Sequence, residues 1–163
     1  MSPSRPVIIL IVGLPGTGKT TLAKKLQIAL GCCVVTSEEI LGALIGSKRI
    51  DADRDLTPQE IHAVYNILYY IVDSLVANGQ SVIVDGVFRS RASRGPIIKI
   101  VKRYKAHLLG IETVCNDTTA LKRLQQRKHA GTISPGGPHT YFKLKKSFDK
   151  APIRFLRINT GPQ

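Results

Sequence analysis

The fourteen residues VIILIVGLPGTGKT, from Val7 to Thr20, constrain the fold more than any other part of this sequence. The stretch from Val7 to Val12 is a continuous aliphatic run, which is typical of a strand buried on both faces of a parallel sheet. The glycine-rich turn after it leads directly into an amphipathic helix, in which Leu22, Ala23 and Leu26 mark the apolar face. A strand, a glycine-rich turn and a helix in this order predict an open α/β fold.

The turn itself, Gly13 to Thr20, matches the phosphate-loop pattern G-x-x-x-x-G-K-[ST]. Small residues let successive backbone N–H groups turn inward as an anion-binding nest, and the following helix points its positive end at the same place. Lys19 is predicted to reach the β- and γ-phosphates of ATP, and the Thr20 hydroxyl to ligate Mg²⁺. The predicted nucleotide-binding residues are Gly13, Leu14, Pro15, Gly16, Thr17, Gly18, Lys19, Thr20 and Thr21.

Four further apolar segments suit strands, and helical patterns separate them. The predicted strands are CCVV from residue 32, SVIVD from 81, AHLLGIET from 106 and IRFLRINT from 153. TPQE, from residue 57, forms a capping box that opens a long helix. A basic helix is predicted over 91–104, with a break or restart at Gly95-Pro96. Strands that alternate with helices predict one three-layer α/β/α domain over 1–163, with a five-stranded parallel sheet.

Length and cysteine content limit the class of protein. A chain of 163 residues is the size of one domain with its own core. Its three cysteines, two of them adjacent, offer no disulfide framework, which predicts a reducing, cytoplasmic setting. The apolar run at 7–12 is too short for a signal peptide, and no run approaches the roughly 18 residues of a membrane span. We therefore predict a cytoplasmic protein without a membrane partner.

The net charge of +13 lies entirely in the second half of the chain. Residues 1–80 carry seven basic and seven acidic side chains, whereas residues 81–163 carry 17 and four. A basic half of this kind is typical of proteins that bind polyanions such as nucleic acid. The alternative is that these Lys and Arg residues only keep the helices solvated, with some of the charge reserved for ATP phosphates.

Acidic residues follow two of the predicted strands, at the sheet edge where ligands of open α/β folds bind. Glu38 and Glu39 come after the second strand, and Asp85 ends the third. We predict that Glu38 activates the acceptor as a base and that Asp85 holds the Mg²⁺ water shell or the acceptor hydroxyl. The alternatives are a first-turn acid that stabilises the next helix, which we prefer for Glu39, and a strand-end turn residue for Asp85.

The segment at about 128–140 is rich in glycine and proline and is predicted to be a mobile lid. Arg123 and Arg127 lie four residues apart on the helix that leads into it, so both can face the nucleotide. Arg127 is our first candidate for the cation that stabilises the transition state, and Arg123 is the second. Arg89 and Arg91, shortly after the third strand, are candidates for binding an anionic acceptor; an ordinary basic helix start is the alternative.

Five segments taken together resemble a known family. They are GLPGTGKTTLAKKL, TSEEI, SVIVDGVFRSRASR, ALKRLQQR and LRINT. In this order and spacing they are similar to the zeta-toxin and polynucleotide-kinase-like group of phosphate-loop kinases, often labelled AAA domain 33. The resemblance covers nearly the whole chain. It implies a sheet of order 2-3-1-4-5, Mg-ATP as donor, and transfer of the γ-phosphate to a hydroxyl of a nucleic acid, seryl-tRNA, a sugar, a sugar nucleotide or an antibiotic.

The family pattern falls on residues already singled out. Its acidic base falls on Glu38, where many members have Asp, and its strand-end acid falls on Asp85. Its lid arginines fall on Arg123 and Arg127. Leu41 stands where the family often has an arginine that holds the acceptor's phosphate, so one acceptor contact is missing.

The combined prediction is an ATP-dependent kinase that acts on an alcohol group of a nucleic acid, a nucleotide or a small molecule. An ATP-gated nucleic-acid-binding module with little transferase activity is the alternative. The sequence has no guanine-reading N-K-x-D motif, which disfavours a GTPase switch. The acceptor, the oligomeric state and the preference for ATP over GTP stay open.

Overall fold

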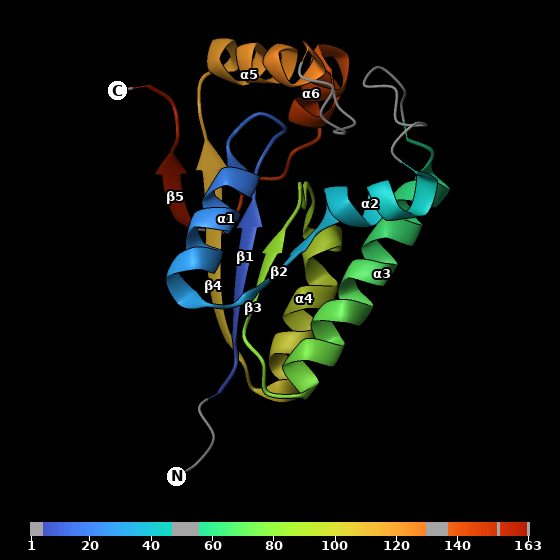
Figure 1. Cartoon of the computed structure of the whole chain (residues 1–163), viewed down its shortest axis with the longest axis vertical. Coiled ribbons are helices and arrows are strands. Elements are labelled where there is room, and N and C mark those ends of the chain that lie inside the picture. The colour runs from blue at the N-terminus through green and yellow to red at the C-terminus, as the bar shows by residue number, and fades with distance from the viewer. Residues whose placement is uncertain (1–4, 47–55, 130–136, 153, 163) are drawn as a thin grey trace.

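A computed structural model describes residues 5–46, 56–129, 137–152 and 154–162 of the chain. Strands and helices alternate along it, as predicted (Figure 1). The elements are β1 (Val7–Val12), α1 (Lys19–Leu30), β2 (Cys33–Thr36), α2 (Ser37–Ile45), α3 (Pro58–Ala77), β3 (Val82–Asp85), α4 (Arg91–Tyr104), β4 (His107–Val114), α5 (Asp117–His129), α6 (Pro138–Lys146) and β5 (Leu156–Asn159).

The five strands form one parallel sheet in the order β2-β3-β1-β4-β5, which is the order that the resemblance implies. β1 lies in the centre and pairs with β3 on one side and with β4 on the other. All the strands run the same way, so their carboxyl ends meet at one edge of the sheet, and α5 and α6 lie above that edge (Figure 1). The carboxyl ends of β2 and β3 lie at this edge, so the predicted acidic residues that end or follow these strands lie there too.

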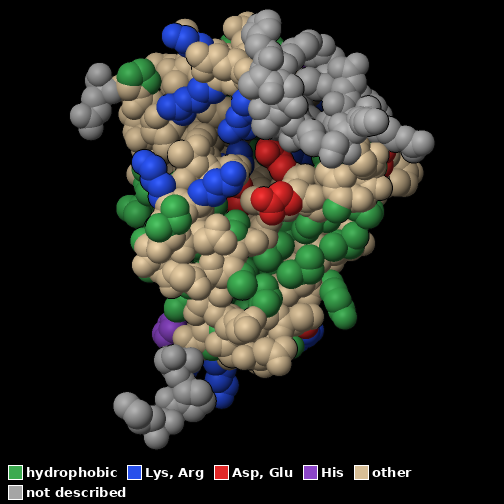
Figure 2. All heavy atoms as spheres, viewed as in Figure 1, with side chains coloured by type: hydrophobic (Ala, Val, Ile, Leu, Met, Phe, Trp, Pro, Cys, Tyr) green, Lys and Arg blue, Asp and Glu red, His purple; other side chains and the backbone are tan. Residues whose placement is uncertain are grey.

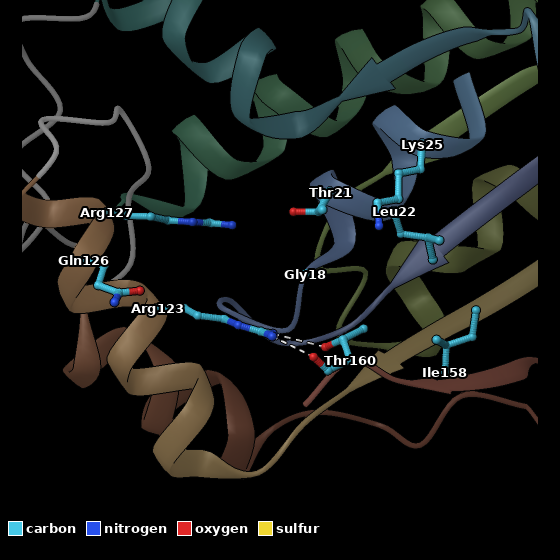
Figure 3. Close-up of a pocket in the computed structure, with 9 residues that line it drawn as sticks. All are labelled: Gly18, Thr21, Leu22, Lys25, Arg123, Gln126, Arg127, Ile158 and Thr160. Atoms are coloured by element: carbon cyan, nitrogen blue, oxygen red, sulfur yellow. Dashed lines mark hydrogen bonds between the residues drawn. The ribbon is translucent and has the colours of Figure 1, made fainter. Parts of the chain in front are cut away.

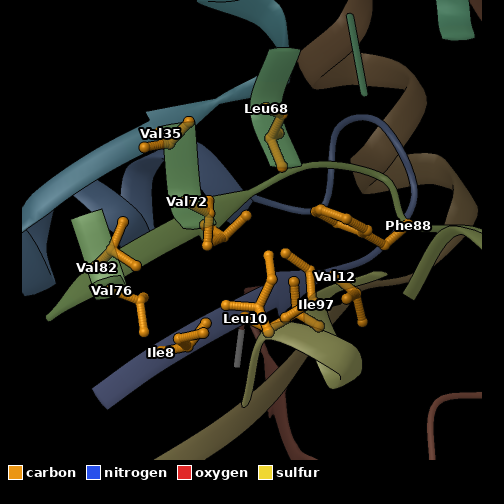
Figure 4. Close-up of a cluster of buried hydrophobic side chains, with 12 residues drawn as sticks. Ile8, Leu10, Val12, Val35, Leu68, Val72, Val76, Val82, Phe88 and Ile97 are labelled. Atoms are coloured by element: carbon orange, nitrogen blue, oxygen red, sulfur yellow. The ribbon is translucent and has the colours of Figure 1, made fainter. Parts of the chain in front are cut away.

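Alternate residues of β1 pack into two different cores, one on each face of the sheet, because successive side chains of a strand point to opposite faces. The odd-numbered residues Ile9 and Ile11 pack with Ala23 of α1. The even-numbered residues pack with side chains of α3 and α4 (Figure 4). Helices on both faces explain why the aliphatic run of β1 is continuous. The larger core contains Ile8, Leu10, Val12, Val35, Leu68, Val72, Val76, Val82, Val84, Phe88, Ile97 and Ile100.

The predicted break at Gly95-Pro96 is wrong, because α4 runs without interruption from Arg91 to Tyr104. Pro96 lies in the second turn, where it removes one helical hydrogen bond at a cost of about 3 kcal/mol. Ile97 and Ile100, which follow it, are buried against the sheet at 0% and 6% exposure. Burial of two such side chains contributes about 3–6 kcal/mol, which offsets the cost of the proline.

The predicted lid at about 128–140 falls only partly on described residues, because 130–136 lie outside them. On either side the prediction of irregular structure is wrong: α5 continues to His129, and α6 begins at Pro138. Proline is compatible with the first position of a helix, where its missing N–H has no helical partner, and Gly137 is the N-cap.

None of the helices in the described ranges is long and apolar enough to cross a membrane.

Candidate active site

The phosphate loop connects β1 to α1 at the carboxyl edge of the sheet, as its sequence predicts. Gly16 and Gly18 have positive φ angles of 78° and 83°, a conformation that residues with a Cβ rarely adopt. A Cβ on Gly16 would lie only 2.6 Å from the carbonyl oxygen of Ala120. The tight loop therefore requires glycine here both for its backbone angle and for its contact with α5.

Replacement of Gly16 by Ala is expected to lower stability by about 1–3 kcal/mol through backbone strain, and to prevent ATP binding because the loop must move away from Ala120. Gly31→Ala is the matched control, because Gly31 also has a positive φ of 65° but has nothing within 4 Å of the added Cβ. Thermal unfolding with and without Mg-ATP measures both effects. Unchanged ligand stabilisation in the Gly16 variant would contradict this account of the loop.

Lys19, the first residue of α1, lies inside the phosphate loop. It is buried, and its Nζ donates a hydrogen bond to the carbonyl oxygen of Leu14 at 2.9 Å. Burial lowers the pKa of Lys19, while the negative charges of Asp85 and Glu38 oppose that shift. The ammonium group is thus held beside the loop with two carboxylates in range of its charge, in the place predicted for a phosphate contact.

Thr20 and Asp85 are brought together across 65 positions of sequence. The Thr20 hydroxyl donates to Asp85 Oδ2 at 2.7 Å. Asp85 is 3% exposed, and burial raises its pKa, a shift that the neighbouring Lys19 opposes. Asp85 Oδ1 and the hydroxyl of Thr36, its pairing partner on β2, are buried and find no hydrogen-bond partner among the described residues. Uncompensated buried oxygens of this kind suit a polar ligand.

This oxygen-rich pair fits a hard cation such as Mg²⁺, which prefers oxygen ligands and keeps several waters. The described part of the chain contains no cluster of three or more His, Cys, Asp or Glu that could hold a metal by itself. Thr20 and Asp85 would therefore supply part of the shell, and phosphate and water oxygens the remainder, as is usual for Mg²⁺ at a phosphate loop.

Glu38 lies in the first turn of α2, which begins directly after β2. Its side chain is half-buried, whereas that of Glu39 is exposed. The charge of Glu38 raises the pKa of both Lys19 and Asp85, so it faces the same centre. The structure thus groups the two predicted carboxylates around Lys19, and Figure 2 shows a small group of acidic side chains near the start of α2 with Lys and Arg around it.

A pocket of about 720 Å³ opens beside the phosphate loop (Figure 3). Arg127 extends from α5 into this pocket, and its charge lowers the pKa of Lys19 and of Asp85. The predicted nucleotide residues Gly18 and Thr21 line the opposite side. The lining residues are Gly18, Thr21, Leu22, Lys25, Arg123, Gln126, Arg127, Ile158 and Thr160.

Arg123 lines the same pocket but is already bonded to the protein. Its guanidinium donates to the carbonyl oxygen of Thr160 at 2.6 Å, to the Thr160 hydroxyl at 3.2 Å and to the carbonyl oxygen of Gly16 at 3.3 Å (Figure 3). Arg123 therefore ties α5 to the phosphate loop and to the end of β5. This arrangement favours Arg127 over Arg123 as the cation for a transferring phosphate.

Two threonines that support the loop are not among the predicted site residues. The Thr160 hydroxyl donates to the carbonyl oxygen of Thr17 at 2.8 Å, and the Thr113 hydroxyl lies 2.8 Å from that of Thr17. Thr160 and Thr113 are 143 and 96 positions away from Thr17 in the sequence, so no local pattern indicates this role. The available signal is that each falls at the carboxyl end of a strand, where ligands of such sheets bind.

The predicted acceptor residues follow Asp85 along the chain, Arg89 in the loop after β3 and Arg91 at the first position of α4. Arg89 and Arg91 are exposed, and they are fastened to the segment after α6: Arg89 Nη1 donates to Ser147 Oγ at 3.2 Å, and the Arg91 backbone N–H donates to Asp149 Oδ2 at 2.9 Å. Neither arginine lines the pocket beside the phosphate loop. Leu41, where relatives often have an arginine, is 3% exposed and packs inside the protein.

The sheet order, the phosphate loop and the helices on both faces define the class as a phosphate-loop nucleotide-binding domain with the kinase fold. Residues 8–149 match the AAA_33 family, described as an AAA domain, and the chain belongs to this family. A search of the curated proteins gives no match.

Solved structures with the same fold include several kinases. A candidate kinase from Chloroflexus aurantiacus is 20% identical, with a TM-score of 0.78, over 97% of this chain and 90% of that one. The APS kinase CysC of Mycobacterium tuberculosis, solved with AMPPNP and APS, is 15% identical, with a TM-score of 0.66, over 97% and 90%. Kti12 from Chaetomium thermophilum, solved with ADP-AlF3, is 16% identical, with a TM-score of 0.70, over 94% and 89%.

Proposed function

We propose that the protein is an Mg²⁺-dependent kinase that transfers the γ-phosphate of ATP to a hydroxyl group. The observation that carries this proposal is the Thr20–Asp85 hydrogen bond beside buried Lys19, with the charge of Glu38 acting on the same centre. A phosphate nest, a candidate metal pair and a further carboxylate are the parts that phosphoryl transfer needs. The kinase fold of the family supports the same reaction.

The phosphate loop holds the donor in this reaction. Its backbone N–H groups and the N-terminus of α1 bind the phosphates, and Lys19 contacts the β- and γ-phosphates. Thr20 and Asp85 would hold the Mg²⁺, which would neutralise phosphate charge when bound. Arg127 reaches from α5 into the pocket and stabilises the charge on the oxygens of the transferring group.

Glu38 serves as the base for the acceptor. The hydroxyl oxygen forms a bond to the γ-phosphorus, the bond to the bridging oxygen of ADP breaks, and ADP leaves with that electron pair; the hydroxyl proton passes to Glu38. Asp85 suits this role less well, because it is almost fully buried and its Oδ2 accepts the Thr20 hydrogen bond. Glu38 is half-buried, so it is more exposed than Asp85.

The acceptor is sought by incubating the protein with γ-labelled ATP and separate sets of 5′-hydroxyl oligonucleotides, nucleosides and sugars. We expect label on one of these classes and none on the others. Transfer of label only to water would contradict a kinase. Oligonucleotide binding that changes with ATP, without any transfer, would instead support an ATP-gated nucleic-acid-binding module, which the +13 charge favours as second candidate.

Removal of divalent metal is expected to abolish transfer, because Thr20 and Asp85 are placed to hold a cation against the phosphates. The measurement is the transfer rate after treatment with EDTA, and after Mg²⁺ is added back in excess. Full restoration by Mg²⁺ is the expected result. A rate that does not change when the metal is removed would contradict the metal role of this pair.

A further inference from the structure

The loop between β3 and α4 contains a residue in an unusual backbone conformation. Phe88 has a φ angle of 43°, in the left-handed region that residues with a Cβ rarely adopt. Lys105, the other described non-glycine residue in this region, ends α4, where a left-handed residue is common. Phe88 does not end a helix. A bulky residue keeps such a conformation only where its surroundings enforce it, and residues strained in this way cluster at functional sites.

Phe88 is held on both sides of its backbone by two different helices. Its N–H donates to the hydroxyl of Tyr65, on α3, at 3.2 Å. Its carbonyl oxygen accepts a hydrogen bond from Arg94 Nη1, on α4, at 2.8 Å. The ring is fully buried in the larger core (Figure 4). There it packs edge-on against the ring of Tyr65, with centroids 5.2 Å apart. We call Tyr65 and Arg94, with Phe88 between them, the Phe88 clamp.

Arg94 is a buried cation whose hydrogen bonds go to the backbone of two loops. It is 5% exposed, and Nη1 donates to the carbonyl oxygen of Phe88 and, at 3.4 Å, to that of Asp149. Burial of a cation is unfavourable unless hydrogen bonds compensate it, and an apolar side chain would fill the same space without that cost. The guanidinium therefore contributes the position of these loops more than it contributes packing.

The residues between Asp85 and Phe88 lie against the phosphate loop and the Phe88 ring. The carbonyl oxygen of Val87 accepts the N–H of Gly13, the first residue of the phosphate loop, at 3.5 Å. A Cβ on Gly86 would lie 2.9 Å from the Phe88 ring, so the ring touches the backbone directly after Asp85. The turn therefore has little room to shift without moving Asp85 or the phosphate loop.

We propose that Tyr65 and Arg94 are positioning residues: they hold Phe88 in its left-handed conformation and thereby keep the Asp85 carboxylate against the Thr20 hydroxyl, where this pair would bind Mg²⁺. Mg²⁺ demands near-ideal octahedral geometry, so a ligand that is free to move binds it less well. Partners behind a metal ligand commonly determine its orientation and the affinity of the site. This inference rests on the proposed role of Thr20 and Asp85 as the metal pair.

The test compares the affinity of the whole chain for AMPPNP in excess Mg²⁺ with its affinity in EDTA, both measured by isothermal titration. The ratio of the two affinities reports the contribution of the metal and cancels any loss that both conditions share. Tyr65→Phe removes the hydroxyl that accepts the Phe88 N–H but keeps the ring, and we expect it to lower the ratio about 3- to 10-fold. Arg94→Met is expected to lower the ratio about 10-fold or more, whereas Arg94→Lys retains a donor and loses less.

Each variant has a matched control on its own helix. Tyr69 lies one turn after Tyr65 on α3, and its hydroxyl donates to the carbonyl oxygen of Ser93 at 2.7 Å. Tyr69→Phe therefore removes a tyrosine hydrogen bond that does not involve Phe88. Both phenylalanine variants are expected to lower the unfolding temperature by about 2–4 °C, but Tyr69→Phe is expected to keep the wild-type ratio. Arg103→Met removes the same charge from an exposed position of α4 and is the control for Arg94→Met.

The double variant, Tyr65→Phe with Arg94→Met, separates action through Phe88 from a direct contact of the Tyr65 hydroxyl with the metal or the nucleotide. Two residues that act through the same third residue are not additive, so the double variant is expected to lower the ratio no further than Arg94→Met does. Losses that multiply in full would show that the two residues act independently and would overturn the proposal.

A wild-type ratio in both Tyr65→Phe and Arg94→Met would overturn the proposal and leave the metal role of Thr20 and Asp85 intact. So would an equal loss in Tyr69→Phe and Tyr65→Phe, because reduced stability would then explain both. If Arg94→Met does not fold, Tyr65→Phe and Arg94→Lys decide the question. A wild-type affinity for AMPPNP that is the same in Mg²⁺ and in EDTA would contradict the metal dependence of the proposed function, and this inference with it.

Discussion

Replacement of Lys19 by Ala is expected to abolish ATP turnover and to weaken ATP binding about 100-fold or more. Two charge-assisted contacts to phosphate, each contributing about 1.5–3 kcal/mol, are lost together. Lys19 is buried, and its Nζ bonds to the carbonyl oxygen of Leu14 inside the loop. No other described lysine makes this bond, so no second ammonium group replaces the one that is lost. Isothermal titration with AMPPNP and Mg²⁺ measures the affinity directly.

The control for Lys19 is Lys24→Ala, which removes an exposed ammonium from the same helix. It changes the net charge equally and is expected to retain wild-type affinity. Wild-type turnover by the Lys19 variant would contradict the assignment of the phosphate loop. Loss of binding in both variants would mean that the overall charge of α1, and not the contact made by Lys19, determines nucleotide affinity.

Replacement of Glu38 by Gln is expected to lower the rate of phosphate transfer about 100-fold or more while ATP affinity stays within about twofold. Glutamine has nearly the same shape as glutamate but does not accept the hydroxyl proton, and removal of a general base typically costs 10²–10⁴-fold. Rates are measured with the acceptor that γ-labelled ATP identifies, and ATP affinity is measured in parallel. The expected loss is in kcat, because the phosphate loop is unchanged.

Two further variants separate the roles of the carboxylates. Glu39→Gln changes an exposed neighbour on the same turn of α2 and is expected to be as active as the wild type. Asp85→Asn removes the charge that would hold the metal beside Thr20, so its activity should be low and require more Mg²⁺. A fully active Glu38 variant would assign the base to Asp85.

Local sequence patterns were sufficient to predict most of the secondary structure. The capping box at Thr57 has the expected reciprocal bonds, since Glu60 donates its backbone N–H to Thr57 Oγ1 and accepts the Thr57 N–H through its carboxylate. Such signals act within three or four residues. The predicted break at Pro96 was wrong because local patterns do not contain the burial of Ile97 and Ile100, which depends on a sheet that is distant in sequence.

The candidate site shows the same division between local and distant interactions. The glycines, Lys19 and Thr20 form a continuous motif, so their role as a phosphate loop is readable residue by residue. The role of Asp85 depends on its contact with Thr20, which the parallel pairing of β1 and β3 creates. Sequence indicated only that Asp85 ends a strand.

The sequence by itself determined the phosphate loop, the alternation of strands and helices, and the basic character of the second half, because each is encoded in neighbouring residues or in composition. Tertiary structure alone decided that Arg123 bonds to Thr160 while Arg127 enters the pocket, since the two arginines have equivalent positions on the helix pattern. It also decided which side of α6 stays exposed, because the contacts of Tyr141 and Lys145 with Asp117 come from a different helix. Side-chain direction depends on these distant partners, and local patterns do not contain them.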